Sequence, residues 1–305
     1  MNQARHEIQV TLAPPPGITP LDVLATAIHA DGKFTVFPAT PPTTIFVLGA
    51  PISSNANVVN NGEILGDVEA AGTVTNNGSI SGSITFPVPV KEMPLPGVFG
   101  AYATIATQLP YAGDIDKHVL APGFNSYGGG LNPDGVYFID TGGLDLVIRA
   151  SRIHGTLVVK CGPLGKVYVD TAALLQSYRS DYPVLIVDGL LTIALDSGLN
   201  DLVESTWAAN FNPVGAPYLS TSDNDQLDNY PNEIQGLIHA TGVIRLRKTS
   251  LVRGVVLGEA DIDAQDDTLI IYDPNLFTNP PLGYTSVDSS QPVEIVAGTW
   301  VQGVN

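Results

Sequence analysis

The sequence is poor in cysteine and in charge, and its few charges are mostly acidic. Cys161 is the only cysteine in 305 residues, so the chain can form no internal disulfide. Charged residues make up 14%, about half the usual share. Lys and Arg total 13 against 30 Asp and Glu, and the net charge is −17. A surface of this charge repels phosphate backbones, which argues against a nucleic-acid partner.

Long apolar runs are also missing. The longest candidate, residues 184–195, is interrupted by Asp188, so we expect no membrane span in this chain. The N-terminus shows no signal-peptide core. The alternation of Ile8, Val10 and Leu12 predicts a strand instead, which leads us to expect that a longer protein lost its upstream part.

The residues that are abundant favour β-structure. Hydrophobic residues make up 44%, enough for a sizeable core, and the chain holds 31 Gly and 24 Pro. Low charge with many turn-forming residues suits stacked strands better than helices, whose exposed faces favour Glu, Lys and Arg.

A phrase repeats after sixteen residues: NNGEILGDV (60–68) returns as NNGSISGSI (76–84). Alternation places Ile64, Gly66 and Val68 on one face. Sixteen residues are too few for a strand-helix-strand crossover, so we predict coils stacked about 4.8 Å apart. We expect Gly62 to take a positive φ at a corner, and the repeated asparagines to form an amide ladder.

The predicted fold is all-β: a right-handed parallel β-helix with irregular insertions. We expect N-terminal strands and a first coil in 1–48, narrow coils in 49–86, and a Pro/Gly-rich linker or insertion in 87–135. A wider β-helix should occupy 136–305, with a loop excursion at 200–232. Phe34 and Val36 also fall on the sixteen-residue grid.

The short coils of form G-x-I-x-G-x-V resemble those of bactofilins and other parallel β-helices. The phrases YPVLIVDG, NFNPVGAPY, YPNEIQGLIHATG and IIYDPNLFTNPPLGY are similar to bacterial envelope proteins that carry a PilX-like membrane helix before a β-helix. This chain lacks that helix. The resemblance implies a cell-envelope or extracellular location, and protein partners of the envelope or self-association.

An acidic loop is the candidate metal site. Asp223, Asp225, Asp228 and Glu233 offer oxygen ligands at a spacing that suits Ca²⁺, the only cofactor that the sequence raises. The EF-hand pattern fails, because the loop glycine is missing and the closing glutamate is misplaced. A solvated acidic loop is the simpler interpretation.

Aromatic residues gather in the same excursion. Flat rings on a loop can stack on sugars, which keeps carbohydrate open as a ligand. The alternative is that the rings pack the loop onto the β-helix wall. The residues are Trp207, Phe211, Tyr218 and Tyr230.

Asp266 and Asp267, with Arg253 as the basic residue, are the candidate catalytic group. Glycoside hydrolases use two carboxylates, and β-helix lyases use a basic proton acceptor. No motif of those families surrounds these residues, and Asp266-Asp267 also suits a turn. We therefore predict a non-enzymatic scaffold or adhesion module, which the resemblance links to pilus-like or secretion machinery, with a β-helical carbohydrate-active enzyme as the alternative. Two carboxylates and a basic residue lining one cleft would favour the enzyme.

Overall fold

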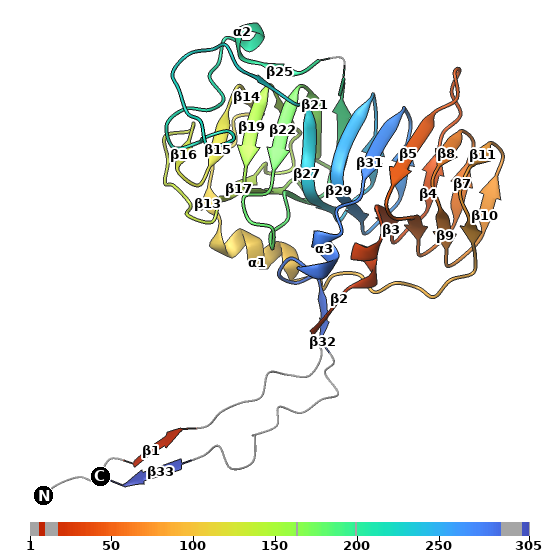
Figure 1. Cartoon of the computed structure of the whole chain (residues 1–305), viewed down its shortest axis with the longest axis horizontal. Helices are drawn as coiled ribbons and strands as arrows, with labels where there is room; N and C mark the ends of the chain where they lie inside the picture. The colour runs from red at the N-terminus through yellow and green to blue at the C-terminus, as the bar shows by residue number, and fades with distance from the viewer. Residues whose placement is uncertain (1–5, 10–17, 163, 199, 288–300, 305) are drawn as a thin grey trace, which may run out of the picture.

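The chain folds as a parallel β-helix with three walls, which we name A, B and C (Figure 1). The computed structural model describes residues 6–9, 18–162, 164–198, 200–287 and 301–304. Each coil runs from wall A to wall B to wall C, and equivalent strands of successive coils pair in parallel. The predicted parallel β-helix is confirmed.

Wall A is a continuous nine-stranded sheet. In spatial order its strands are β10 (Val74–Asn76), β7 (Val58–Asn60), β4 (Phe34–Val36), β30 (Ile262–Ala264), β28 (Ile244–Leu246), β24 (Leu190–Leu195), β21 (Lys166–Thr171), β18 (Leu146–Arg149) and β14 (Asp114–Asp116).

Walls B and C follow the same spatial order and share the two longest strands. Wall B holds β11 (Ser79–Ile80), β8 (Glu63–Leu65), β5 (Thr44–Leu48), β31 (Thr268–Ile271), the first halves of β29 (Ser250–Gly258) and β27 (Glu233–Ala240), β22 (Ala173–Gln176), β19 (Ser151–His154) and β15 (Val119–Ala121). Wall C holds β12 (Ile84–Thr85), β9 (Val68–Ala70), β6 (Ile52–Ser54), β3 (Ile28–Ala30), the second halves of β29 and β27, β23 (Leu185–Asp188), β20 (Thr156–Lys160), β17 (Val136–Asp140) and β13 (Thr107–Gln108).

The chain begins this solenoid in the middle and also finishes it there. It enters at β3, coils to one end at β12, and crosses through residues 86–97 and α1 (Val98–Ile105) to the other end. From there it coils back until β30 pairs with β4 and β31 with β5. The two ends of the chain leave together, where β2 (Ile18–Pro20) pairs antiparallel with β32 (Thr285–Val287) (Figure 1). The short strands β1 (His6–Gln9) and β33 (Val301–Val304) also pair antiparallel.

The sixteen-residue repeat marks the narrow end of the β-helix. Val74 lies in register with Val58, and Ile84 with Val68, each sixteen residues apart. The amide ladder is present: Asn60 Nδ2 donates to Asn76 Oδ1 over 2.8 Å, and Asn77 Nδ2 donates in the opposite direction to Asn61 Oδ1 over 2.9 Å. Identical side chains at a constant spacing therefore stabilise the stack.

Two expectations about this end are wrong. Gly62 does not take a positive φ. Glycine is needed there because a Cβ would lie 2.3 Å from the Thr43 carbonyl oxygen of the adjacent coil. Phe34 pairs with Val58, 24 residues away, and therefore lies off the sixteen-residue grid. The offset falls from 24 residues at β4 to 19 at β5 and 16 at β6, so five of the eight additional residues lie between β4 and β5 and three between β5 and β6.

The three walls differ in what covers them. Helix α1 packs on β17, β20 and β23 of wall C, and the one-turn helices η1 (Asp22–Ala25) and α3 (Asn275–Thr278) contact each other beside it. The excursion at 200–232 covers the α1-proximal end of wall B with α2 (Glu204–Trp207), β25 (Leu202–Val203) and β26 (Asn229–Tyr230) (Figure 1). Strand β16 (Phe124–Asn125) pairs antiparallel with β15 at that end. None of the described elements covers the centre of wall B, which lies in front in Figure 1.

The domain boundaries expected from the sequence can be located along this path. Residues 28–85 form the narrow coils, and they stack directly on coils from residues 244–271. Residues 86–105 are the crossover, whereas 107–125 already contribute strands β13 to β16. Of the expected N-terminal strand, Ile8 lies in β1, and Val10 and Leu12 lie outside the described residues.

Candidate functional site

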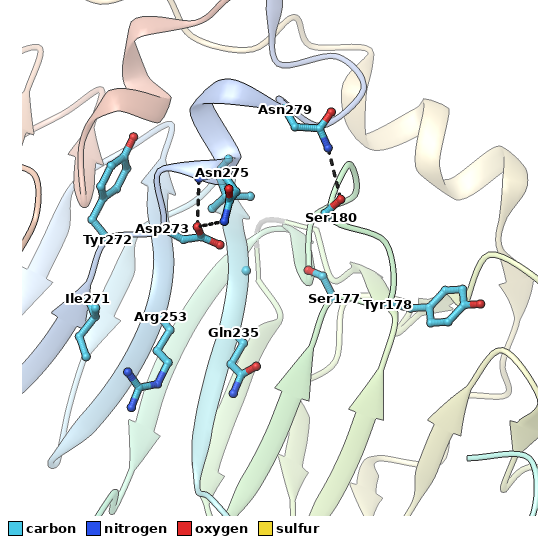
Figure 2. A pocket seen from close by; sticks show the side chains of 12 residues that line it. Ser177, Tyr178, Ser180, Gln235, Arg253, Ile271, Tyr272, Asp273, Asn275 and Asn279 are labelled. Atoms are coloured by element: carbon cyan, nitrogen blue, oxygen red, sulfur yellow. Dashed lines mark hydrogen bonds between the residues drawn. The ribbon is translucent and has the colours of Figure 1, made fainter. Parts of the chain in front are cut away.

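A polar cleft lies at the corner between walls B and C, and we name it the corner cleft (Figure 2). Its volume is about 790 Å³, within the range of ligand-binding clefts. The floor consists of Gln235, Arg253 and Ile271, which point outward side by side on β27, β29 and β31. One side is the loop from Ser177 to Asp181, and the other is the segment 272–279 that contains α3.

Two glycines make the floor of this corner possible. Gly236 and Gly254 have φ values of +130° and +154°, and they let β27 and β29 turn from wall B into wall C without interruption. A Cβ on Gly254 would lie 2.0 Å from the Gly236 carbonyl oxygen, and a Cβ on Gly236 would lie 2.3 Å from Ser177 Oγ. Glycine is therefore needed at both positions, because the adjacent coil and the 177–181 loop leave no room for a side chain.

Both sides of the cleft are held in place. Asn279 Nδ2 donates to Ser180 Oγ over 3.3 Å and so joins the two sides (Figure 2). The Arg179 guanidinium lies 4.4 Å from the centroid of the Tyr182 ring and forms an ion pair with Asp181. Both contacts stabilise the 177–181 loop. These contacts make the cleft a preformed feature of the fold.

The charges at the corner cleft nearly cancel. Arg253 Nε donates to Glu233 Oε2 over 2.9 Å, while 47% of its side chain remains exposed. Glu233 is buried and also accepts from Gln235. Asp273 accepts bonds from both the backbone N–H and the side-chain amide of Asn275 (Figure 2). Hydroxyl and carboxamide groups remain the main hydrogen-bonding groups.

An apolar stripe crosses the uncovered centre of wall B. Leu251, Leu269, Phe46 and Leu65 lie in register on consecutive coils, all pointing outward. Leu48 and Ile271 form a second row beside them. The exposed fractions of Phe46 and Leu48 are 40% and 44%, so this wall presents hydrophobic side chains to solvent. A shallow groove of about 360 Å³ runs along Phe46 and Leu269.

A third cleft, of about 350 Å³, holds the candidate acids at the corner between walls A and B. It is lined by Asp196, Asp266, Asp267 and Lys248. Asp266 accepts the backbone N–H of Lys248 over 3.0 Å, and Asp267 accepts that of Thr44 over 2.7 Å. Both carboxylates thus stabilise turns. The hydrogen bond to Asp170 raises the pKa of Lys248, which keeps this amine protonated and unsuited to accept a proton.

Arg253 does not join that group. It lies in register with Ile271, four residues beyond Asp267, a separation of about 13 Å along a strand. Arg253 lines the corner cleft, whereas Asp266 and Asp267 line the A–B corner. The three residues proposed from the sequence as one catalytic group therefore lie in two separate clefts.

The predicted calcium ligands are also divided. Asp223 and Asp225 come together with Glu204, which the sequence analysis did not include, and one carboxylate oxygen of each lies within 4.8 Å of the others. Asp228 lies nearby and accepts from Asn212 Nδ2 over 2.8 Å. Glu233 lies instead on wall B with Arg253. The calcium hypothesis stays a prediction. The carboxylates that lie close together are those of Glu204, Asp223 and Asp225, with Asp228 nearby, and Glu233 is not among them.

The four aromatic residues of the excursion form one cluster against wall B. Phe211 and Tyr230 are buried, with ring centroids 6.0 Å apart, while Trp207 and Tyr218 are half-buried at the edge. The arrangement matches packing of the loop onto the wall, and the hypothesis of sugar stacking stays a prediction for the two half-buried rings.

Two buried charges fix the excursion, and the sequence analysis gave neither this role. The Arg152 guanidinium donates to the carbonyl oxygens of Phe211, Ala216 and Pro217 at 2.7–2.9 Å and lies 5.2 Å from the centroid of the Tyr218 ring. Glu204 accepts the Phe211 backbone N–H and the Tyr230 hydroxyl. The backbone of one residue, Phe211, thus links the buried guanidinium to the buried carboxyl group.

Cys161 is buried. Burial and the nearby Asp188 raise the pKa of its thiol to about 11. The flanking Lys160 and Lys166 therefore do not activate this thiol.

No protein-family model and no curated protein matches the chain. Solved structures that are similar to it at low levels include three ice-binding proteins. An ice-binding protein from an Arctic yeast shows 10% identity and a TM-score of 0.35, covering 86% of this chain and 96% of its own. The DUF3494 domain of ice-binding protein 1 from Shewanella frigidimarina shows 10% identity and a TM-score of 0.31, covering 84% and 98%. An ice-binding protein from the Antarctic ascomycete Antarctomyces psychrotrophicus shows 12% identity and a TM-score of 0.28, covering 84% and 100%.

These comparisons give no support to the names suggested by the resemblance to bactofilins and PilX-associated proteins. The β-helix that the resemblance implied is present, as the strand pairings above establish. Among the described residues, no helix is long and apolar enough to cross a membrane.

Proposed function

We propose that the chain is a non-enzymatic adhesion module that binds a flat, ordered surface through the apolar stripe of wall B. The observation that carries this proposal is the register of Leu251, Leu269, Phe46 and Leu65 on four consecutive coils. Strand spacing gives the stripe a length of about 14 Å. Contiguous exposed apolar surface of this kind is typical of interaction sites.

The rigidity of the wall supports the same proposal. Strands β5, β8, β31 and β29 are each paired on both sides, so their outward side chains are already ordered before a partner binds. Binding therefore costs little conformational entropy. A flat partner that presents apolar surface, such as the face of a crystalline polysaccharide, matches the stripe in shape and polarity.

Binding to solids tests this function. We expect the protein to co-sediment with at least one of crystalline cellulose, chitin and ice, the last included because the similar solved structures are named ice-binding proteins. Phe46→Ser with Leu269→Ser should abolish retention. A matched control, Leu144→Ser with Leu164→Ser, replaces exposed leucines elsewhere and should be retained normally. Retention that survives the Phe46/Leu269 change would refute the role of the stripe, and no retention by any solid would refute the function.

The cellular setting belongs to this proposal. The sequence resemblance suggests an envelope or extracellular module associated with pilus-like or secretion machinery, with protein partners or further copies of the chain. Co-purification of the tagged chain from surface-exposed fractions of its native cells checks this setting. Recovery only from the cytoplasm would contradict it.

A carbohydrate-active enzyme is the second candidate, because Asp196, Asp266, Asp267 and Lys248 line one cleft. The protonated Lys248 and the turn bonds of the two aspartates weigh against it. The wild type and Asp266→Asn can be assayed on a panel of soluble polysaccharides. Release of reducing or unsaturated ends by the wild type but not by the variant would favour the enzyme. Absence of both products would leave the adhesion module as the function.

A further inference from the structure

We propose that the corner cleft binds a neutral oligosaccharide, independently of the apolar stripe. The cleft is preformed, lies at the edge of wall B, and is lined by residues of consecutive coils. Four coils contribute, from the 177–181 loop through β27 and β29 to β31, which gives a length of about 14 Å. This length suits a short sugar chain better than a single ring.

The chemistry of the lining excludes other ligand classes. Ile271 and Leu276 are its only aliphatic side chains and stand among polar groups, so a wholly apolar ligand would leave those polar groups unpaired. The single cation, Arg253, is already paired with Glu233, and Asp273 lies opposite, so an anion gains little. Asp273 is the only carboxylate in the lining, which is too few for a bare divalent cation.

The groups that remain match sugar hydroxyls, which both donate and accept. Ser177 Oγ is buried and has no hydrogen-bond partner among the described residues. Arg253 uses Nε for Glu233, and no bond from its two terminal nitrogens is found in the described part of the chain. Figure 2 shows both side chains with Gln235 and Asn275 around the same space. The ring of Tyr178 is directed away from Gln235 and Arg253, so hydrogen bonds rather than stacking should dominate (Figure 2).

Isothermal titration of the full chain tests the site. The probes are β-1,4-linked tetrasaccharides of glucose, xylose, mannose and N-acetylglucosamine, with tetragalacturonate as the acidic comparator. We expect saturable binding of at least one neutral probe and weaker binding of the acidic one. Gln235 Nε2 donates to Glu233 and its Oε1 accepts from Gln176, which leaves one N–H and one lone pair of the amide for a sugar hydroxyl. Gln235→Leu should weaken binding about tenfold, because about 1.4 kcal/mol is lost with these remaining hydrogen bonds. Asn275→Ala should act in the same direction.

Two controls make the result specific. Gln265→Leu makes the same change on wall A, where the amide contacts Arg247, and should bind the neutral probe like the wild type. Phe46→Ser, which removes part of the stripe, should also leave binding of the soluble probe unchanged, so that failure of the cleft and failure of the stripe can be told apart. The proposal is overturned if no neutral tetrasaccharide binds, if tetragalacturonate binds best, or if Gln235→Leu and Asn275→Ala both bind like the wild type while remaining folded by circular dichroism.

Discussion

His29 should make the β-helix sensitive to mild acid. It lies on β3 of wall C, in register with Leu257 and Ser53, and its side chain is fully buried. Neither ring nitrogen has a hydrogen-bond partner among the described residues. Burial, aided by the charge of Lys91, lowers the pKa of His29 from 6.5 to about 3.

The sign follows from proton linkage. Between pH 6.5 and 3 the unfolded chain binds a proton at this histidine and the folded chain does not, so stability falls as the pH falls. The difference of about 3.5 pKa units corresponds to about 5 kcal/mol over the whole window. About 3 kcal/mol of this should be lost between pH 6.5 and pH 4.

Urea unfolding of the wild type and His29→Leu, from pH 7.5 to pH 4, measures this effect. The variant should be at least as stable as the wild type near neutral pH, because two unpaired buried nitrogens are removed. Its stability should fall less steeply with acid, by about 3 kcal/mol at pH 4. His118→Leu, at a half-buried histidine, is the control and should change the slope less. Parallel pH profiles for wild type and His29→Leu would refute the reasoning.

Further predictions concern the ladder, the excursion and the acidic loop. Asn60→Ala should lower the free energy of unfolding in urea by about 1–3 kcal/mol, because it leaves the Gly62 N–H without its partner. Asn77→Ala, at an exposed position of the ladder, should lower it by less than about 1 kcal/mol. Equal losses would contradict the role of the buried ladder. Arg152→Met should increase hydrogen exchange within residues 204–230 and leave β23 protected; unchanged exchange there would show that the guanidinium does not hold the excursion. Calcium should raise the melting temperature of the wild type but not of Asp223→Asn, and a flat titration would end the calcium hypothesis. Light scattering at high concentration tests end-to-end association through the unpaired edges of β10, β11 and β12, and a monomer would count against it.

The narrow coils could be predicted because their contacts repeat in the sequence. Residues sixteen apart in these coils are direct neighbours in space. The ladder therefore needs an asparagine at both position 60 and position 76, and this repetition can be read from the sequence. The order of the remaining coils could not be predicted in this way. Phe34 pairs with Ile262, 228 residues later, and nothing in the local pattern of either strand specifies that partner.

The candidate sites also divide into contacts between residues close in sequence, which could be predicted, and contacts between residues far apart in sequence, which could not. Asp223 and Asp225 are close in sequence and lie together, whereas their third neighbour, Glu204, comes from a different turn of the excursion. The corner cleft joins Ser180 to Asn279 across 99 residues, and its floor depends on how β27 stacks on β29. Such a site becomes visible only when the stacking order is known. The grouping of Arg253 with Asp266 was wrong because residues close in sequence need not be close in space. Arg253 lies beside Ile271 at the end of β31, whereas Asp266 precedes the start of that strand.

Binding through wall B can be tested by hydroxyl-radical footprinting of the protein adsorbed on the solid that retains it best. We expect oxidation of Phe46, Leu48, Leu65 and Leu269 to fall on adsorption. Exposed residues elsewhere, such as Leu144 and Leu164, should remain as reactive as in free protein. Protection of those residues, with Phe46 and Leu269 still oxidised at the rate of the free protein, would contradict the account.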